Sequence, residues 1–174
     1  MWNPILRTLT VAVVVLLSTA GCGELSSELA PDSPLVEART SPEMLAEAAL
    51  AALAARDDSA LAALMITREE YETLLWPSMP DKEHMPFAFV WSVTGPRSRS
   101  ARRNAVSDYG GAPLELVRVE LSDDVEAYEA FTLHRTARMR VRNTETGQEG
   151  LIPLMDALVE MGGGWKFMNF RDDL

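Results

Sequence analysis

Apolar residues in the first part of the chain recur at the spacing of α-helices. Through the alanine-rich stretch 42–56, leucines and alanines repeat every three or four positions, and Ser41 followed by Pro42 is typical of a helix start. Thr67 and Glu70 have the spacing of a capping box, which predicts a second clear helix start. The predicted helices lie at about 42–56, 58–65, 68–75, 87–93 and 98–109.

Two proline-containing stretches interrupt these helices. Three prolines between 77 and 86 predict an exposed loop. Gly95 and Pro96 are expected to separate the last two helices, because proline has no N–H and its ring crowds the preceding helical turn.

From Leu114 onward the apolar residues alternate with polar ones, which is the pattern of half-buried strands. The predicted strands lie at about 114–121, 128–141, 148–161 and 165–171, the third bent or bulged at Pro153. The connections between them are short, and short connections force antiparallel neighbours. The sequence therefore predicts an α+β fold, with N-terminal helices on one face of a curved antiparallel sheet of about four strands.

The order of these elements and the ending Gly-Gly-Gly-Trp165-Lys166-Phe167 resemble the NTF2-like superfamily, over about 41–172. The resemblance implies a cone-shaped domain that opens with a long helix. The superfamily includes isomerases, dehydratases and plain binding or assembly modules, so the resemblance implies no particular activity.

The first 21 residues have the plan of an export signal. Arg7 precedes an uncharged run from Thr8 to Gly23 that ends in small residues. This run is shorter than the ~20 apolar residues that a helix needs to cross a bilayer. A cleaved signal peptide at 1–21 is therefore favoured over a permanent membrane span.

Cys22, the single cysteine of the chain, follows Ser-Thr19-Ala-Gly directly. This sequence resembles the bacterial lipobox, with Thr19 where leucine is usual. The resemblance implies that Cys22 becomes a lipidated N-terminus, so that the membrane is a partner through the lipid and the protein faces the periplasm. Gly23 after the cysteine suits sorting to the outer membrane. The alternative is a buried thiol near an ordinary cleavage site.

The composition changes after Cys22. Residues 22–40 combine Ser, Pro, Glu and Asp with few large apolar groups, which is typical of a solvated tether. Residues 41–174 have the length of one domain with one core. The net charge of −10 and the pI near 4.7 argue against a nucleic-acid partner, since phosphate binding needs a basic surface.

One basic cluster stands out in this acidic chain. Its members are Arg97, Arg99, Arg102 and Arg103. Such a cluster could dock an anionic partner or a lipid head group, although a solvated helical face is the commoner interpretation.

Few residues offer catalytic chemistry. His84 lies in the proline-rich stretch, where solvation is the commoner role, and His134 lies within a predicted strand. Pairing about the turn near 143–147 places His134 opposite Ala157, next to Asp156, so that the two could form a proton-transfer pair. The commoner readings are a structural histidine, and a surface Asp156 that is salt-bridged to an arginine.

The arginines in reach of Asp156 in the predicted sheet are Arg138 and Arg140. No nucleophile elbow, P-loop, dinucleotide motif or Cys/His metal spacing occurs in the chain, so no metal or cofactor is expected.

Three aromatic residues, Tyr71, Trp76 and Trp91, could line a ligand cavity, although core packing is their default role. The first functional hypothesis is a non-enzymatic envelope lipoprotein that binds a small apolar ligand or a protein partner. It predicts an apolar or closed mouth of the sheet, with no acid of shifted pKa inside. The competing hypothesis is a periplasmic isomerase- or hydrolase-like enzyme that uses His134 and Asp156.

Overall fold

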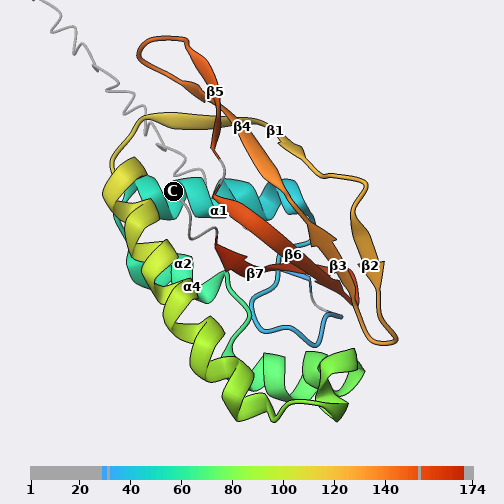
Figure 1. Cartoon of the computed structure of the whole chain (residues 1–174). Coiled ribbons are helices and arrows are strands. Elements are labelled where there is room, and N and C mark those ends of the chain that lie inside the picture. The colour runs from blue at the N-terminus through green and yellow to red at the C-terminus, as the bar shows by residue number, and fades with distance from the viewer. Residues whose placement is uncertain (1–28, 31, 153, 171–174) are drawn as a thin grey trace, which may run out of the picture.

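The computed structural model describes residues 29–30, 32–152 and 154–170, whose arrangement Figure 1 shows. The predicted signal peptide at 1–21 and the predicted lipidation site at Cys22 lie outside the described residues. No helix in the described part of the chain is long and apolar enough to cross a membrane.

The helices begin where the capping residues predict. They are α1 (Pro42–Ala54), α2 (Asp58–Ala63), α3 (Arg68–Glu70) and α4 (Phe87–Tyr109). The Ser41 hydroxyl accepts a backbone N–H of the first turn of α1 at 3.1 Å, and Thr67 and Glu70 form the predicted capping box. A π turn at Tyr71–Leu75 continues α3. Short 3-10 turns follow at Trp76–Ser78 and Pro80–Glu83.

The prediction that Gly95 and Pro96 separate two helices is wrong, because α4 runs through both residues. A proline inside a helix removes one backbone hydrogen bond and crowds one turn. Phe87 before it and Ala101 after it are both buried, so each half of α4 is attached to the core. Tertiary packing of this kind contributes most of a helix's stability, and here it outweighs the local loss.

The strands form two antiparallel sheets beside the helices (Figure 1). One sheet has the order β1-β4-β5 and consists of β1 (Leu114–Glu120), β4 (Arg138–Asn143) and β5 (Glu149–Ile152). The other has the order β2-β3-β6-β7 and consists of β2 (Val125–Ala127), β3 (Thr132–Arg135), β6 (Met155–Met161) and β7 (Gly164–Phe170). The α+β class with antiparallel strands is confirmed, whereas the single sheet is not.

Each of the two long predicted strands is in fact two strands. The segment 128–141 breaks at Thr136, whose φ of 58° lies in the left-handed region that strands do not use. β3 and β4 on either side of Thr136 therefore belong to different sheets. The segment 148–161 likewise contributes β5 to one sheet and β6 to the other. Alternation alone did not reveal the break at Thr136, because it continues on both sides of that residue. The second break falls between Ile152 and Met155, where an irregularity was predicted.

Two buried clusters hold the layers together. The first joins α1, α2 and α4 to the sheets and includes Leu53, Met139, Leu158 and Phe167. The second includes residues of the π turn and of β3 and β6, among them Leu75. Its residues Ala157 and Val159 flank Leu158 of the first cluster, so the two clusters lie on opposite faces of β6.

Part of the segment expected to be a solvated tether is packed on the domain. Leu35 and Ala38 are only 3% and 1% exposed. Arg39 exchanges two backbone hydrogen bonds with Trp165 of β7, at 2.8 and 3.1 Å. Gly164 permits this approach, since a Cβ there would lie 2.3 Å from the Ser33 hydroxyl oxygen. The folded unit therefore begins before residue 41, which the polar composition of the segment concealed.

Candidate functional site

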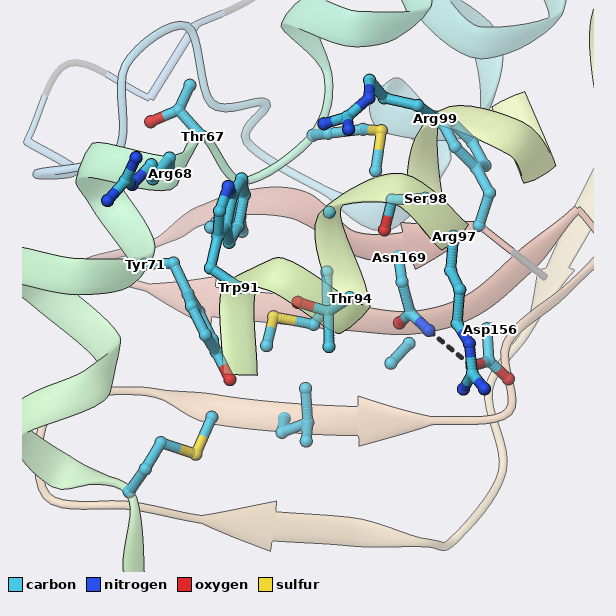
Figure 2. A pocket seen from close by; sticks show the side chains of 18 of the residues that line it. Thr67, Arg68, Tyr71, Trp91, Thr94, Arg97, Ser98, Arg99, Asp156 and Asn169 are labelled. Carbon is cyan, nitrogen blue, oxygen red and sulfur yellow. Dashed lines mark hydrogen bonds between the residues drawn. The ribbon is translucent and has the colours of Figure 1, made fainter. Parts of the chain in front are cut away.

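A cavity of about 700 Å³ lies between the helices and the four-stranded sheet, and Figure 2 shows it from close by. One wall comes from α4, a second from the segment that joins α2 to the π turn, and the third from β2, β3, β6 and β7. Leu133, Ala157 and Met168 contribute apolar surface from the sheet, and Met65 and Ile66 contribute it from the facing segment.

Aromatic side chains form part of the lining. Tyr71 and Trp91 both line the cavity, with ring centroids 6.1 Å apart, and Phe87 packs against both at 5.7 and 6.0 Å. Trp76 packs on Tyr71 at 6.2 Å but is not among the lining residues. Burial, together with the charge of Asp81, raises the pKa of the Tyr71 hydroxyl, so this group stays neutral at ordinary pH.

Three of the four arginines of the basic cluster line the cavity, namely Arg97, Arg99 and Arg102, whereas Arg103 does not. Arg68 and Arg135 line it as well. The expectation of an apolar or closed mouth is therefore wrong. Arg97, Arg99 and Arg103 are exposed, as expected of a solvated helical face. The sequence did not show that the sheet lies opposite this face of α4.

Most of these arginines already have a carboxylate partner. The Arg102 guanidinium makes two hydrogen bonds to Asp58, at 2.6 and 2.9 Å. Arg135 binds Glu126 in the same bidentate way, at 2.6 and 3.1 Å. Arg68 lies 3.8 Å from a carboxylate oxygen one turn along its helix. Within the described residues, neither Arg97 nor Arg99 forms an ion pair.

Two of the three acidic residues that line the cavity, Glu126 and Asp156, accept side-chain hydrogen bonds. The bonds from Arg135 and from the Tyr128 hydroxyl hold the pKa of the Glu126 carboxyl below its ordinary value, so this acid is shifted away from proton transfer at neutral pH. Asp156 accepts a hydrogen bond of 2.7 Å from the Asn169 side-chain amide (Figure 2). Among the described residues, Asp156 makes no ion pair, so the predicted salt bridge to Arg138 or Arg140 is wrong.

Arg140 instead binds Glu120 at 2.9 Å, across the other sheet. This pairing follows from the break at Thr136, which places β4 in a different sheet from β6.

The structure does not bring His134 and Asp156 together. His134 lies opposite Leu158, one position from the predicted Ala157. Leu133 lines the cavity, and neighbouring residues of a strand point to opposite faces, so His134 points away from the cavity that Asp156 lines. The imidazole Nε2 lies 3.2 Å from a Glu160 carboxylate oxygen. The imidazole ring packs on the Trp165 ring. His84, the other histidine, is exposed.

Sequence reasoning missed a buried ion pair behind the cavity wall. The side chains of Glu70 and Lys166 are only 6% and 2% exposed, and the Lys166 ammonium lies 3.0 and 3.1 Å from the two carboxylate oxygens. Those oxygens also accept the backbone N–H groups of Thr67 and Val36, at 2.7 and 2.8 Å. The capping-box pattern marked Glu70, but no local pattern links it to a lysine 96 positions away.

Burial by itself raises the pKa of the Glu70 carboxyl, but the Thr67 and Val36 hydrogen bonds and the Lys166 charge outweigh it and lower the pKa below its ordinary value. This pair joins the packed N-terminal segment, α3 and β7, because Val36, Glu70 and Lys166 each belong to one of them.

The described residues contain no cluster of His, Cys, Asp and Glu that could hold a metal ion. Comparison with protein-family models, with curated proteins and with solved structures gives no match.

Proposed function

We propose that the protein is a lipid-anchored envelope lipoprotein whose domain binds a small ligand in this cavity and catalyses no reaction. The observation that carries the proposal is the cavity itself. Its volume of about 700 Å³ lies within the range of roughly 300–1,000 Å³ typical of small-molecule sites. Its lining combines aromatic and aliphatic side chains with eight charged ones, five of which are arginines.

A small ligand is favoured over a protein partner because the cavity lies between layers of the fold. A flat or convex surface suits a protein partner, whereas a hollow enclosed on three sides suits a compact molecule. The enzymatic alternative lacks its proposed pair, since only Asp156 of the two residues lines the cavity.

We also propose an NTF2-like arrangement for the domain. A long first helix, α1, precedes the strands, and the last strand opens with Gly164, Trp165 and Lys166. The cavity lies between the helices and the four-stranded sheet, which is the position expected for the cavity of an NTF2-like cone.

The anchor in this proposal is a lipid on Cys22, with the outer membrane of a diderm bacterium as the location. The packed N-terminal segment supports a short connection to the membrane. Because Leu29 already pairs with Arg39, the stretch 22–28 that links it to Cys22 spans at most about 23 Å at ~3.3 Å per residue. The domain would then be held close to the bilayer that its lipid enters.

Native mass spectrometry of the purified full chain tests ligand binding. The expected result is a co-purifying small molecule of defined mass. Thr94→Trp should remove it, because Thr94 is an exposed residue of α4 that lines the cavity and tryptophan would occupy the space. Ser92→Trp is the matched control on the same helix, since Ser92 is exposed and does not line the cavity. Equal adduct masses in both variants would contradict the proposal.

Membrane fractionation tests the anchor. Cys22→Ser should shift the protein from the detergent-extracted membrane fraction to the soluble or uncleaved pool, because no thiol remains to take the lipid. Unchanged fractionation, or an intact mass that shows an unmodified Cys22, would contradict lipidation.

A further inference from the structure

One face of α4 presents Trp91, Gly95 and Arg99 to the cavity at intervals of four residues. Residues four apart lie above one another on a helix, so these three form a single stripe. Figure 2 shows Trp91 and Arg99 on this helix, with the Tyr71 ring beside Trp91.

The middle position of the stripe allows the two outer side chains to approach each other. A Cβ at Gly95 would lie 3.2 Å from the Trp91 indole nitrogen and 3.5 Å from a guanidinium nitrogen of Arg99. Glycine leaves this space free, and Gly95 is buried beneath the two side chains. The two nitrogens therefore lie within about 7 Å of each other, a span that the oxygens of a single carboxylate or phosphate can bridge.

These two donors have no partner within the described part of the chain. The Trp91 indole N–H donates no hydrogen bond there, and the Arg99 guanidinium forms neither a hydrogen bond nor an ion pair. The neighbouring Arg102 differs, since Asp58 holds it with two hydrogen bonds. Arg97 also differs, because its side chain extends toward Asp156, away from Arg99 (Figure 2).

Apolar surface continues from this polar region into the cavity. Tyr71 and Ile66 line it on the helical side, and Leu133 and Met168 line it on the sheet. A ligand that fits this lining has a charged end next to the two donors and an apolar body along the cavity.

We infer that the ligand is a single-chain amphiphile with an anionic head group, and that Arg99 and the Trp91 indole N–H hold this head. The inference rests on the proposed function and adds the chemical class of the ligand. The negative charge comes from a carboxylate or a phosphate, and an acyl or alkyl chain occupies the apolar part of the cavity.

Isothermal titration calorimetry of the full chain tests this inference. An amphipathic polymer keeps the chain in solution, and a titration into the polymer alone supplies the heat to be subtracted. The probes are decanoate, decyl phosphate, 1-decanol and decylammonium, which share a chain and differ in the head. We expect the anions to bind roughly tenfold or more tightly than the alcohol, as a charge-assisted hydrogen bond implies, and decylammonium to bind most weakly. If decyl phosphate binds more tightly than decanoate, the head group is a phosphate. If decanoate binds more tightly, the head group is a carboxylate.

Arg99→Gln should lower the affinity for the two anions to that for 1-decanol. The affinity for 1-decanol should stay unchanged, which also shows that the cavity is intact. Arg99→Lys should keep part of the preference. Arg103→Gln is the control, because this exposed arginine lies on the same helix and does not line the cavity. It should bind all four probes as the unaltered chain does.

The outcomes separate the inference from the function on which it rests. Equal affinity for decanoate and 1-decanol, or an unaltered preference in Arg99→Gln, overturns the anionic head while ligand binding stands. Failure of all four probes to bind overturns the inference. Ligand binding itself is then judged by the co-purified mass and its loss in Thr94→Trp.

Discussion

Replacing Lys166 with methionine removes the positive member of the buried pair while keeping the length of the side chain. Glu70 would remain buried and charged, with the two backbone N–H groups as its only partners. Removing one member of a buried ion pair costs about 3–5 kcal/mol, because the other charge is left uncompensated. We expect the lower end, about 3 kcal/mol, since those two hydrogen bonds remain.

The reciprocal change, Glu70→Gln, should cost about 4 kcal/mol. It leaves the Lys166 ammonium buried without a counter-charge, and the single amide oxygen of glutamine can serve only one of the two N–H groups that Glu70 now serves. In the double variant no buried charge is left. Its remaining cost comes from one unsatisfied backbone N–H and the unpaired amide NH2 of the glutamine, about 2 kcal/mol in all.

Urea unfolding of the three variants, followed by circular dichroism, measures these free energies. The double variant should be more stable than either single variant, which gives a coupling free energy of about 5 kcal/mol. Arg142→Met is the control, because this arginine is exposed between Glu115 and Glu149. Additivity of the two single changes to within about 0.5 kcal/mol would refute the reasoning.

The pair also makes stability depend on pH. Because the folded-state pKa of Glu70 is lowered, its contribution is fully present above the ordinary pKa of 4.5 and is lost as the pH falls through the lowered value. The unaltered protein should therefore lose more stability between about pH 6 and pH 3 than Lys166→Met, in which one cause of the lowering is absent. Parallel pH profiles for the two proteins would contradict this.

Three further changes have expected costs in the same urea assay. Ser41→Ala removes the cap of α1 and should cost about 1 kcal/mol; no change would show that the cap is dispensable. Leu158→Ala, at a fully buried position, should cost about 2–5 kcal/mol, and a cost below ~1 would mean that the core collapses around the gap. Arg142→Ala should cost less than about 1 kcal/mol, and a larger loss would show that its exposed ion pairs act as a network.

Much of the local structure was predictable because it depends on residues that are neighbours in the chain. The caps at Ser41 and Thr67 mark helix starts through contacts that span three positions. The pairing about the turn near 143–147 is also confirmed, with Met139 opposite Ile152 in the predicted register. A short turn sets that register by itself.

The site was predictable only in part. Tyr71 and Trp91 were selected as aromatic candidates and line the cavity, but Trp76, selected on the same grounds, packs behind it. Aromatic character indicates that a side chain prefers to leave water. It does not indicate whether that side chain fills the core or lines a cavity. Arg99 belongs to the basic cluster found in the sequence, but no pattern among its neighbours in the chain indicates that it lies opposite the sheet.

The helix starts, the alternation of the strands, the acidic charge and the signal-like N-terminus with Cys22 can be read from the sequence, because each depends on composition or on neighbours within a few positions. The continuation of α4 through Pro96, the division of the strands at Thr136 into two sheets, and the pairing of Glu70 with Lys166 depend on the folded chain. These features depend on contacts between residues far apart in the chain, and the free energy of such contacts exceeds the local preferences that a sequence pattern records.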